Sequence, residues 1–425
     1  MSNARVVLVE RLHSTSRSLL HELQSLAETI DCEVAATLTQ VRPQAGKFQI
    51  GEGKVDELKA LIAKFGATKI IFENELKPTQ AYNLAKATGL EVVDKFQVVL
   101  EVFSKHASTK EARLQIKLAR LKYELVRARE KVRLAKKGEQ PGFHGLGRYE
   151  VEVYYEAIKR QVAHIEDELS RIREEKRLRR MSREKLGLLV ISLAGYTSAG
   201  KSTLFNALTN SRVAVTGKPF TTLSTKTSAV DFSGKRGLLC DTVGFIDNLS
   251  IDLMEAFRST LEETIFSTLI ILVIDASEPL EEVERKTRCC IRTLREIGVV
   301  TPPIIAALNK IDMVEPAHLQ RVGEIVRPFC TCEVSISALR QTNLGDLRSL
   351  IAHELRGFIK VSFELPLTSK SMSLMSRIRE MGLVIDQKYS DKSLVVTLES
   401  QDYVMDKIKS HMENAGGKVL EAYRI

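Results

Sequence analysis

The sequence predicts an α/β multidomain protein built around a P-loop nucleotide-binding domain. Three observations carry this prediction: a length of 425 residues, the alternation of short apolar runs with helical stretches, and the phosphate-loop motif GYTSAGKST. The chain is too long to form a single domain around one hydrophobic core, since domains typically span about 100–200 residues. We expect four parts, namely an N-terminal parallel α/β domain (1–104), a basic two-helix coiled-coil linker (105–186), a P-loop domain (187–357) and a C-terminal ferredoxin-like domain (358–425).

The composition is typical of a soluble globular protein, with 44% hydrophobic and 28% charged residues. No apolar run approaches the roughly 18 residues that span a bilayer, and the N-terminus MSNARVVLVERLHS has no signal-peptide pattern. We therefore expect a cytoplasmic protein. No pair of C-x-x-C motifs offers a zinc site, and although CTC at 330–332 could in principle hold metal, we interpret the cysteines as buried reduced thiols. They are Cys32, Cys240, Cys289, Cys290, Cys330 and Cys332.

In the N-terminal part, the apolar runs ARVVLVE, EVAATLT, KIIFEN and EVVD alternate with single helical stretches. This alternation predicts a small parallel sheet. The segment IGEGKVDEL places Gly51 and Gly53 before a helix whose first amides could hold an anion. We favour the alternative interpretation, in which the glycines simply form a turn, because so short a glycine pattern is weak evidence of an anion site.

The linker carries two heptad seams separated by the Gly/Pro-bearing loop KKGEQPGFHGLGRYE. Apolar residues spaced by alternating threes and fours predict an antiparallel coiled-coil hairpin. The first seam contains Leu114, Leu118, Leu121, Leu125, Ala128, Val132 and Ala135, and the second contains Tyr155, Ile158, Val162, Ile165, Leu169 and Ile172.

The positive charge of the chain is concentrated in this linker. Residues 105–185 contain 23 Lys/Arg and 13 Asp/Glu, a net of +10, so the other residues of the +9 chain sum to −1. Residues 110–137 alone contain eleven Lys/Arg and three Asp/Glu, a net of +8. A solvated helix face is one explanation. We favour polyanion binding, above all RNA, because this charge lies along a projecting rod.

The C-terminal part has the order β-α-β-β-α-β, beginning with VSFELPL and a helix with Met372, Met375 and Ile378 on one face. This order is that of the ferredoxin-like plan. The aromatic signature of an RNA-recognition sheet is lacking, so we interpret the domain as an interaction module.

The motif at 195–203 follows the apolar strand LLVISLA and matches G-x-x-x-x-G-K-[ST]. Its glycines let backbone amides approach a phosphate chain, Lys201 adds charge at the β- and γ-phosphates, and the Ser202 hydroxyl ligates Mg²⁺. The following helix directs its positive dipole end at the phosphates. The predicted nucleotide-binding residues here are Gly195, Tyr196, Thr197, Ser198, Ala199, Gly200, Lys201, Ser202 and Thr203.

The base-reading element is predicted at NKID, residues 309–312, after the strand PIIAAL. Asp312 can accept hydrogen bonds from the guanine N1–H and amino groups, where adenine offers no matching pair. Asn309 supports the loop, and the Lys310 stem covers the ring. A second loop, SISAL, is predicted to meet guanine O6 through a backbone amide, so GTP is preferred over ATP. Its binding residues are Ser337, Ala338 and Leu339.

Two switch segments lie between these motifs. In KPFTTLSTKT, Thr222 is the expected sensor of the γ-phosphate through Mg²⁺, with Thr221 as the alternative. In DTVGF, Asp241 serves the metal through water and Gly244 serves the γ-phosphate by its amide, but Phe245 stands where a water-orienting Gln would help. The predicted contacts are Phe220, Thr221, Thr222, Leu223, Asp241, Thr242, Val243 and Gly244.

The motifs GYTSAGKSTLFNAL, FTTL, DTVGFI and NKID, with the upstream IGEGKVDEL and TKEARLQIKLARLKYEL, resemble the Obg–HflX branch of translation-associated GTPases, and specifically the HflX family. The resemblance implies a ribosome-binding GTPase whose hairpin probes rRNA of the large subunit, and an N-terminal domain that binds adenine nucleotide. PGFHGLGRYEVEVY in place of a Gly-rich RGPGE segment, and Ser198 in place of Asn, resemble the archaeal version.

We therefore expect a monomeric GTPase that cleaves the β–γ bond with Mg²⁺ by in-line attack of water. Lys201, Thr222 and Gly244 are the expected catalytic residues; Ser202, Thr222 and Asp241 are the expected metal site. With Phe245 unable to orient water, intrinsic turnover should be slow and raised by the large ribosomal subunit. The alternatives are a ribosome-binding or splitting factor in which GTP binding alone acts, and a signalling GTPase with a protein partner.

Overall fold

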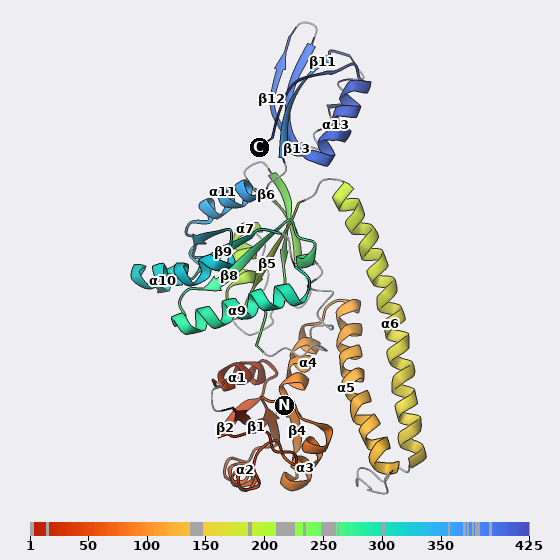
Figure 1. Cartoon of the computed structure of the whole chain (residues 1–425), viewed down its shortest axis with the longest axis vertical. Coiled ribbons are helices and arrows are strands. Elements are labelled where there is room, and N and C mark those ends of the chain that lie inside the picture. The colour runs from red at the N-terminus through yellow and green to blue at the C-terminus, as the bar shows by residue number, and fades with distance from the viewer. Residues whose placement is uncertain are drawn as a thin grey trace. The chain divides into compact units, whose positions relative to one another are not determined.

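The computed structural model describes residues 4–13, 17–136, 148–185, 189–209, 226–232, 235–247, 261, 263–299, 302–355, 358–368, 371, 374–375, 378, 383–390 and 393–424. The chain forms two compact units. The first holds the described residues up to Ile172 together with Ile246 and Asp247, and the second holds the other described residues. Figure 1 labels most of the elements.

The N-terminal domain is a four-stranded parallel sheet in the order β2-β1-β3-β4. Its strands alternate with helices, which confirms the predicted parallel α/β arrangement. β1 lies inside the sheet and its consecutive valines and leucine are fully buried. The elements are β1 (Arg5–Leu12), α1 (Leu20–Thr29), β2 (Glu33–Val41), α2 (Glu52–Phe65), β3 (Lys69–Phe72), α3 (Pro78–Thr88), β4 (Glu91–Asp94) and α4 (Lys95–His106).

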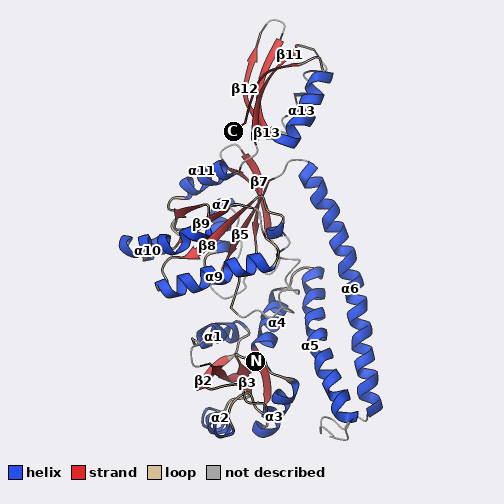
Figure 2. Ribbon diagram, viewed as in Figure 1, coloured by secondary structure: helices blue, strands red, loops and turns tan. Residues whose placement is uncertain are grey.

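Two long helices follow, α5 (Lys110–Lys136) and α6 (Arg148–Lys185) (Figure 2). Ion pairs join Lys110 to Glu168 at 2.6 Å and Lys122 to Glu166 at 3.1 Å, so positions later in α5 face positions earlier in α6. The side chains of Val132 and Ala135 and the loop 137–147 lie outside the described residues. The apolar cluster between the helices contains Leu121, Ala128, Ile158, Val162, Ile165 and Leu169, with Leu114, Leu118, Leu125 and Tyr155 packed against it.

The second unit contains a six-stranded sheet in the order β10-β9-β8-β5-β7-β6. All neighbouring strands are parallel except β6, which is antiparallel to β7. The carboxyl ends of the parallel strands therefore meet at one edge. The elements are β5 (Leu189–Gly195), α7 (Lys201–Thr209), β6 (Lys226–Phe232), β7 (Lys235–Asp241), β8 (Leu269–Asp275), α9 (Leu280–Glu296), β9 (Ile304–Asn309), η1 (Ile311–Met313), α10 (Pro316–Val326), η2 (Arg327–Phe329), β10 (Cys332–Ser335) and α11 (Leu344–Glu354).

The C-terminal strands form a separate antiparallel sheet in the order β12-β13-β11-β14. Of the predicted first helix, Met375 and Ile378 are helical and buried, whereas Met372 lies outside the described residues. The elements are β11 (Phe358–Pro366), β12 (Leu383–Tyr389), β13 (Ser393–Gln401), α13 (Asp402–Asn414) and β14 (Lys418–Arg424).

The cysteines are all free thiols. Cys32, Cys240, Cys289 and Cys290 are buried, as predicted, and Cys330 and Cys332 are half-buried. No helix in the described part of the chain is both long enough and apolar enough to cross a bilayer.

Candidate nucleotide-binding site

The phosphate loop runs from the end of β5 to the start of α7, and atoms of neighbouring segments pack closely against its backbone. Gly195 and Gly200 have φ of 148° and 99°, which L side chains rarely adopt. A Cβ at Gly195 would lie 2.3 Å from the Val273 carbonyl oxygen, and a Cβ at Gly200 would lie 2.2 Å from Asn309 Nδ2. The two glycines are therefore required by backbone geometry and by space.

Lys201 begins α7 and is buried beneath this loop. Its Nζ donates to the carbonyl oxygens of Gly195 at 3.0 Å and Tyr196 at 2.7 Å. Burial lowers the pKa of the ammonium to about 8, and the charge of Asp241 opposes the shift. The residue is therefore a buried cation at the N-terminus of a helix, a position at which an anionic ligand is stabilised.

Ser202 and Asp241 meet at the same edge of the sheet. The Ser202 hydroxyl donates to Asp241 Oδ2 at 2.8 Å, and Asp241, the last residue of β7, is fully buried. A hydroxyl and one carboxylate are the oxygen donors that Mg²⁺ takes in phosphate-binding sites. The described residues contain no cluster of three or more His, Cys, Asp or Glu that could hold a metal by itself. The first switch lies outside the described residues, so nothing is placed for Phe220, Thr221, Thr222 and Leu223.

The second switch lies directly against the phosphate loop. The Phe245 amide donates to the Gly195 carbonyl at 3.0 Å, and its carbonyl accepts from the Thr197 amide at 2.9 Å. The Phe245 side chain is 1% exposed, so the ring is buried. A Cβ on Gly244 would lie 2.9 Å from Lys201 Nζ and from Thr197 Cα. Just before them, the Thr242 hydroxyl donates to the Leu193 carbonyl at 2.6 Å, and Val243 is buried.

Asn309 joins the phosphate loop to the second base-reading loop. Its Nδ2 donates to the Ala199 carbonyl at 2.9 Å, and its Oδ1 accepts from the Ala338 amide at 2.9 Å. Asp312 Oδ1 accepts from the Ser337 hydroxyl at 2.6 Å, which lowers the pKa of the carboxyl. These contacts bring together the three motifs that the sequence places far apart.

The remaining predicted residues lie around this centre. Lys310 forms an ion pair with Asp275 at the end of β8. Ser198 is exposed with φ of 62°, Thr203 is half-buried in α7, and Leu339 is 76% exposed. The roles assigned to the individual residues stay predictions.

Two features of the site were not predicted from the sequence. Asp275 pairs with Lys310, and the Tyr196 ring lies under two cations of α9, with Lys286 Nζ at 4.9 Å and Arg285 Cζ at 5.6 Å from its centroid. An acidic residue ending the strand LIILVID was a usable signal for the first. The cation–π contacts have no sequence pattern, because they join two elements about 90 residues apart.

Gly51, one of the two candidate anion-binding glycines of the N-terminal domain, has a packing role. Its amide donates to the Gln40 side chain at 2.9 Å, and a Cβ would lie 2.2 Å from Arg42 Nη1. The helix that follows begins at Glu52, so Gly53, which was predicted to precede the helix, lies within its first turn instead. These contacts favour the turn-forming explanation of the glycine.

A mainly parallel sheet with a phosphate loop, a buried lysine, a Ser–Asp pair and an Asn-Lys-x-Asp loop defines a P-loop GTPase. Three family matches agree: "GTP-binding GTPase N-terminal" over residues 17–104, "GTP-binding GTPase Middle Region" over 106–183 and "50S ribosome-binding GTPase" over 190–310. The chain binds guanine nucleotide and is a GTP hydrolase.

The chain belongs to the HflX family of GTPases. It is 39% identical over 412 residues to the GTPase HflX of Thermofilum pendens, covering 95% of this chain and 96% of that one. It is 39% identical over 392 residues to the GTPase HflX of Methanocaldococcus jannaschii, covering 92% of this chain and 95% of that one. It is 35% identical over 415 residues to the GTPase HflX of Caldanaerobacter subterraneus, covering 96% of this chain and 93% of that one. The archaeal resemblance is confirmed.

A solved structure is also similar, the SsGBP and GDP complex. Its TM-score is 0.50 at 30% sequence identity, and the match covers 82% of this chain and 98% of that one. None of the relatives named here supports the predicted adenine nucleotide at the N-terminal domain.

Proposed function

We propose that this GTPase binds the large ribosomal subunit and that the subunit accelerates its otherwise slow hydrolysis of GTP. The observation that carries the proposal is the match of residues 190–310 to a family described as 50S ribosome-binding GTPase. The same residues include the phosphate loop and Asn309, which form part of the candidate nucleotide site. A cytoplasmic location follows from such a partner.

The basic linker supplies the surface for this partner. Arg113, Lys117 and Arg120 are exposed on α5 and follow one another at spacings of four and three, so they share one helix face. Such a row of cations fits a phosphate backbone, to which cations contribute sequence-independent affinity. We assign α5 and α6 as a coiled-coil hairpin, supported by their apolar cluster and ion pairs.

The C-terminal domain is assigned as a ferredoxin-like interaction module. Its antiparallel strand order β12-β13-β11-β14 supports this assignment, because the first and third strands of that plan are central. We assign it no catalytic role, and we propose that the whole chain acts as a monomer on the ribosome.

For hydrolysis, we propose that the amides of the phosphate loop and the Lys201 ammonium hold the β- and γ-phosphates for in-line attack by water. Ser202 and Asp241, with Thr222, would hold Mg²⁺ directly or through water, and the bound ion would supply neutralisation of the phosphate charge. The Gly244 amide would meet the γ-phosphate.

No described side chain at the switch is suited to orient the attacking water. The Phe245 ring is buried and its backbone is paired with the phosphate loop, so a Gln at this position would not be expected to reach the water. We infer that the ribosomal partner completes the site, which makes intrinsic turnover slow.

Co-sedimentation with purified large subunits under GDP, GTP and a non-hydrolysable GTP analogue tests the partner and the nucleotide gating together. Retention that depends on the analogue or GTP supports the proposal. If the chain also acts fully on ribosomes when it holds the non-hydrolysable analogue, a factor in which binding alone acts would be favoured. Absence of retention under all three nucleotides would favour a signalling GTPase with a protein partner.

A further inference from the structure

A cavity of about 640 Å³ lies at the carboxyl edge of the parallel sheet in the N-terminal domain. Its lining includes Arg11 near the end of β1, Glu73 directly after β3 and Lys95 directly after β4. It also includes residues of α5, and all of these residues belong to the first compact unit. Ligands of parallel α/β sheets typically bind at this edge, in cavities of roughly 300–1,000 Å³. The position and size of the cavity therefore fit a ligand site.

Basic side chains outnumber acidic ones around this cavity. Its described lining has four basic and two acidic residues, an excess of two positive charges, namely Arg11, Lys77, Lys95 and Arg127 against Glu73 and Glu75. The helix α3 also begins here, since Lys77 and Pro78 line the cavity, and the N-terminus of a helix adds partial positive charge. The cavity therefore favours a negatively charged ligand.

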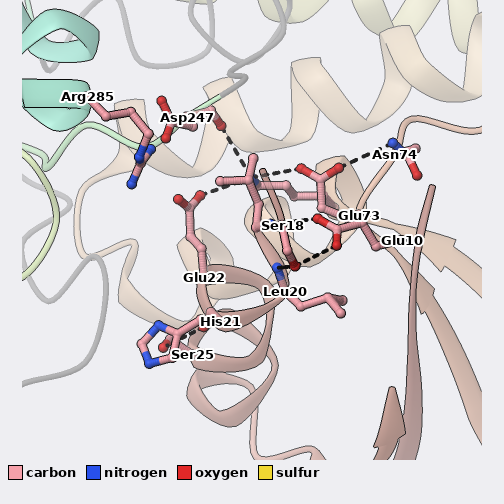
Figure 3. Close-up of polar contacts among 12 residues, drawn as sticks. Glu10, Ser18, Leu20, His21, Glu22, Ser25, Glu73, Asn74, Asp247 and Arg285 are labelled. Carbon is pink, nitrogen blue, oxygen red and sulfur yellow. Dashed lines mark hydrogen bonds and ion pairs between the residues drawn. The ribbon is translucent and has the colours of Figure 1, made fainter. Parts of the chain in front are cut away.

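Two carboxylates at this edge are already engaged by other groups of the first unit. Glu73 accepts hydrogen bonds from Lys95 Nζ and from Asn74 Nδ2, both at 3.4 Å, and Figure 3 shows the contact between Glu73 and Asn74. Asp94, the last residue of β4, is fully buried and accepts from the Tyr123 hydroxyl of α5 at 2.8 Å. Glu73 thus supplies a counter-charge to Lys95, and not to the arginines of the cavity.

The two arginines of the cavity have hydrogen-bonding capacity that the described residues do not use. Arg11 is 9% exposed, and its Nη1 donates to the Arg42 carbonyl oxygen at 3.0 Å. Arg127 lies over the Tyr123 ring, and its Nη2 donates to the Tyr123 hydroxyl at 2.7 Å. The Nε atoms of both arginines are buried without a hydrogen-bond partner among the described residues. Because buried cations without a counter-charge are unfavourable, an anionic ligand would account for both guanidinium groups.

We propose that this cavity binds a small organic anion, with a carboxylate or phosphoryl group held by the guanidinium groups of Arg11 and Arg127. Guanidinium groups pair with both kinds of oxyanion in a bidentate geometry. The apolar part of the lining, which includes Leu76, Phe96 and Val99, fits an uncharged body attached to this group. A nucleoside triphosphate carries more negative charge than an excess of two cations balances, so a ligand with one anionic group is favoured over adenine nucleotide.

The test uses the full chain with its phosphate-loop site filled by GDP. Calorimetry measures the binding of phenyl phosphate and of benzoate, with benzamide as the uncharged analogue and ATP as the competing nucleotide. We expect saturable binding of at least one of the two anions with a Kd of at most about 1 mM, and no binding of benzamide. The anion that binds more tightly identifies the group that the arginines hold.

Arg11→Gln and Arg127→Gln should each weaken this binding by at least about tenfold, because each variant removes a charged donor. Arg5→Gln on β1 and Arg129→Gln on α5 remove the same charge outside the cavity lining. They are the matched controls and should bind the anion as the unaltered chain does. If circular dichroism shows that Arg11→Gln does not fold, Arg127→Gln, whose side chain is half-buried, decides the test.

Three results would overturn the proposal: no binding of either anion, equal binding of benzamide, or undiminished binding in a folded cavity variant. If ATP displaces the anions and binds more tightly than either of them, the cavity belongs to adenine nucleotide and the proposal is also wrong. The proposal does not depend on GTP hydrolysis, so its failure would leave the proposed function untouched.

Discussion

Gly244 is the residue at which the packing of the switch leaves the least room. A Cβ there would lie 2.9 Å from Lys201 Nζ, Thr197 Cα and Thr197 Cγ2, closer than side chains pack. We expect Gly244→Ala to lower GTP turnover by at least about tenfold, because either the switch or the phosphate loop must move, and to affect GDP affinity less. Gly345→Ala in α11, where a Cβ meets nothing within 4 Å, is the matched control and should leave turnover unchanged. Equal turnover of the two variants would contradict this account of the switch.

Lys201 gives the site a pH dependence with a definite sign. Its pKa of about 8 lies below the ordinary value for lysine, so the free site loses its cation as the pH rises above 8. Bound phosphates favour the ammonium, so GDP binding should take up a proton, and the affinity should fall above pH 8 by up to about one log unit per pH unit. Calorimetry in buffers of different ionisation enthalpy measures this uptake. Pure pH independence from 8 to 10 would show that Lys201 does not titrate there.

Among the elements, the charged face of α5 makes the clearest prediction about binding. Replacing Arg113, Lys117 and Arg120 by Gln should weaken co-sedimentation with large subunits. It should also reduce the slope of log affinity against log salt by roughly 0.7–0.9 for each phosphate group that the variant no longer neutralises. The control carries the same charge change on exposed lysines of the N-terminal domain, Lys59, Lys64 and Lys86. If both triple variants bind equally weakly, net charge and not the α5 face determines binding.

The elements themselves were largely predictable, because each has a periodic signature. The alternation of apolar runs and helices indicated the parallel sheet of the N-terminal domain, and spacings of three and four located the residues that pack between α5 and α6. The motif residues that follow the parallel strands also lie close together, as expected, because the carboxyl ends of parallel strands lie at the same edge of a sheet.

What escaped prediction are side-chain contacts between distant segments. The Lys95–Asp247 hydrogen bond joins residues 152 positions apart and leaves no repeat in the sequence. Gly51 was ambiguous for a related reason: its amide partner Gln40 and its neighbour Arg42 come from β2 and the turn after it, and a short glycine pattern does not reveal them.

At the scale of the whole molecule, we propose that the nucleotide site is complete only with the ribosomal partner. The chain contributes the phosphate loop, the base-reading loops and the second switch, and the Phe245 ring, at the position where we predict that the attacking water is oriented, is buried. A site of this kind should bind guanine nucleotide well and turn it over slowly, because binding and water activation depend on different groups.

The most direct test is the rate of GTP hydrolysis by the full chain with and without purified large ribosomal subunits at fixed salt. We predict a low rate for the chain alone, a rise of at least about tenfold with saturating large subunits, and little response to small subunits as the control. A rate that is unchanged by large subunits, or that is already high without them, would contradict it.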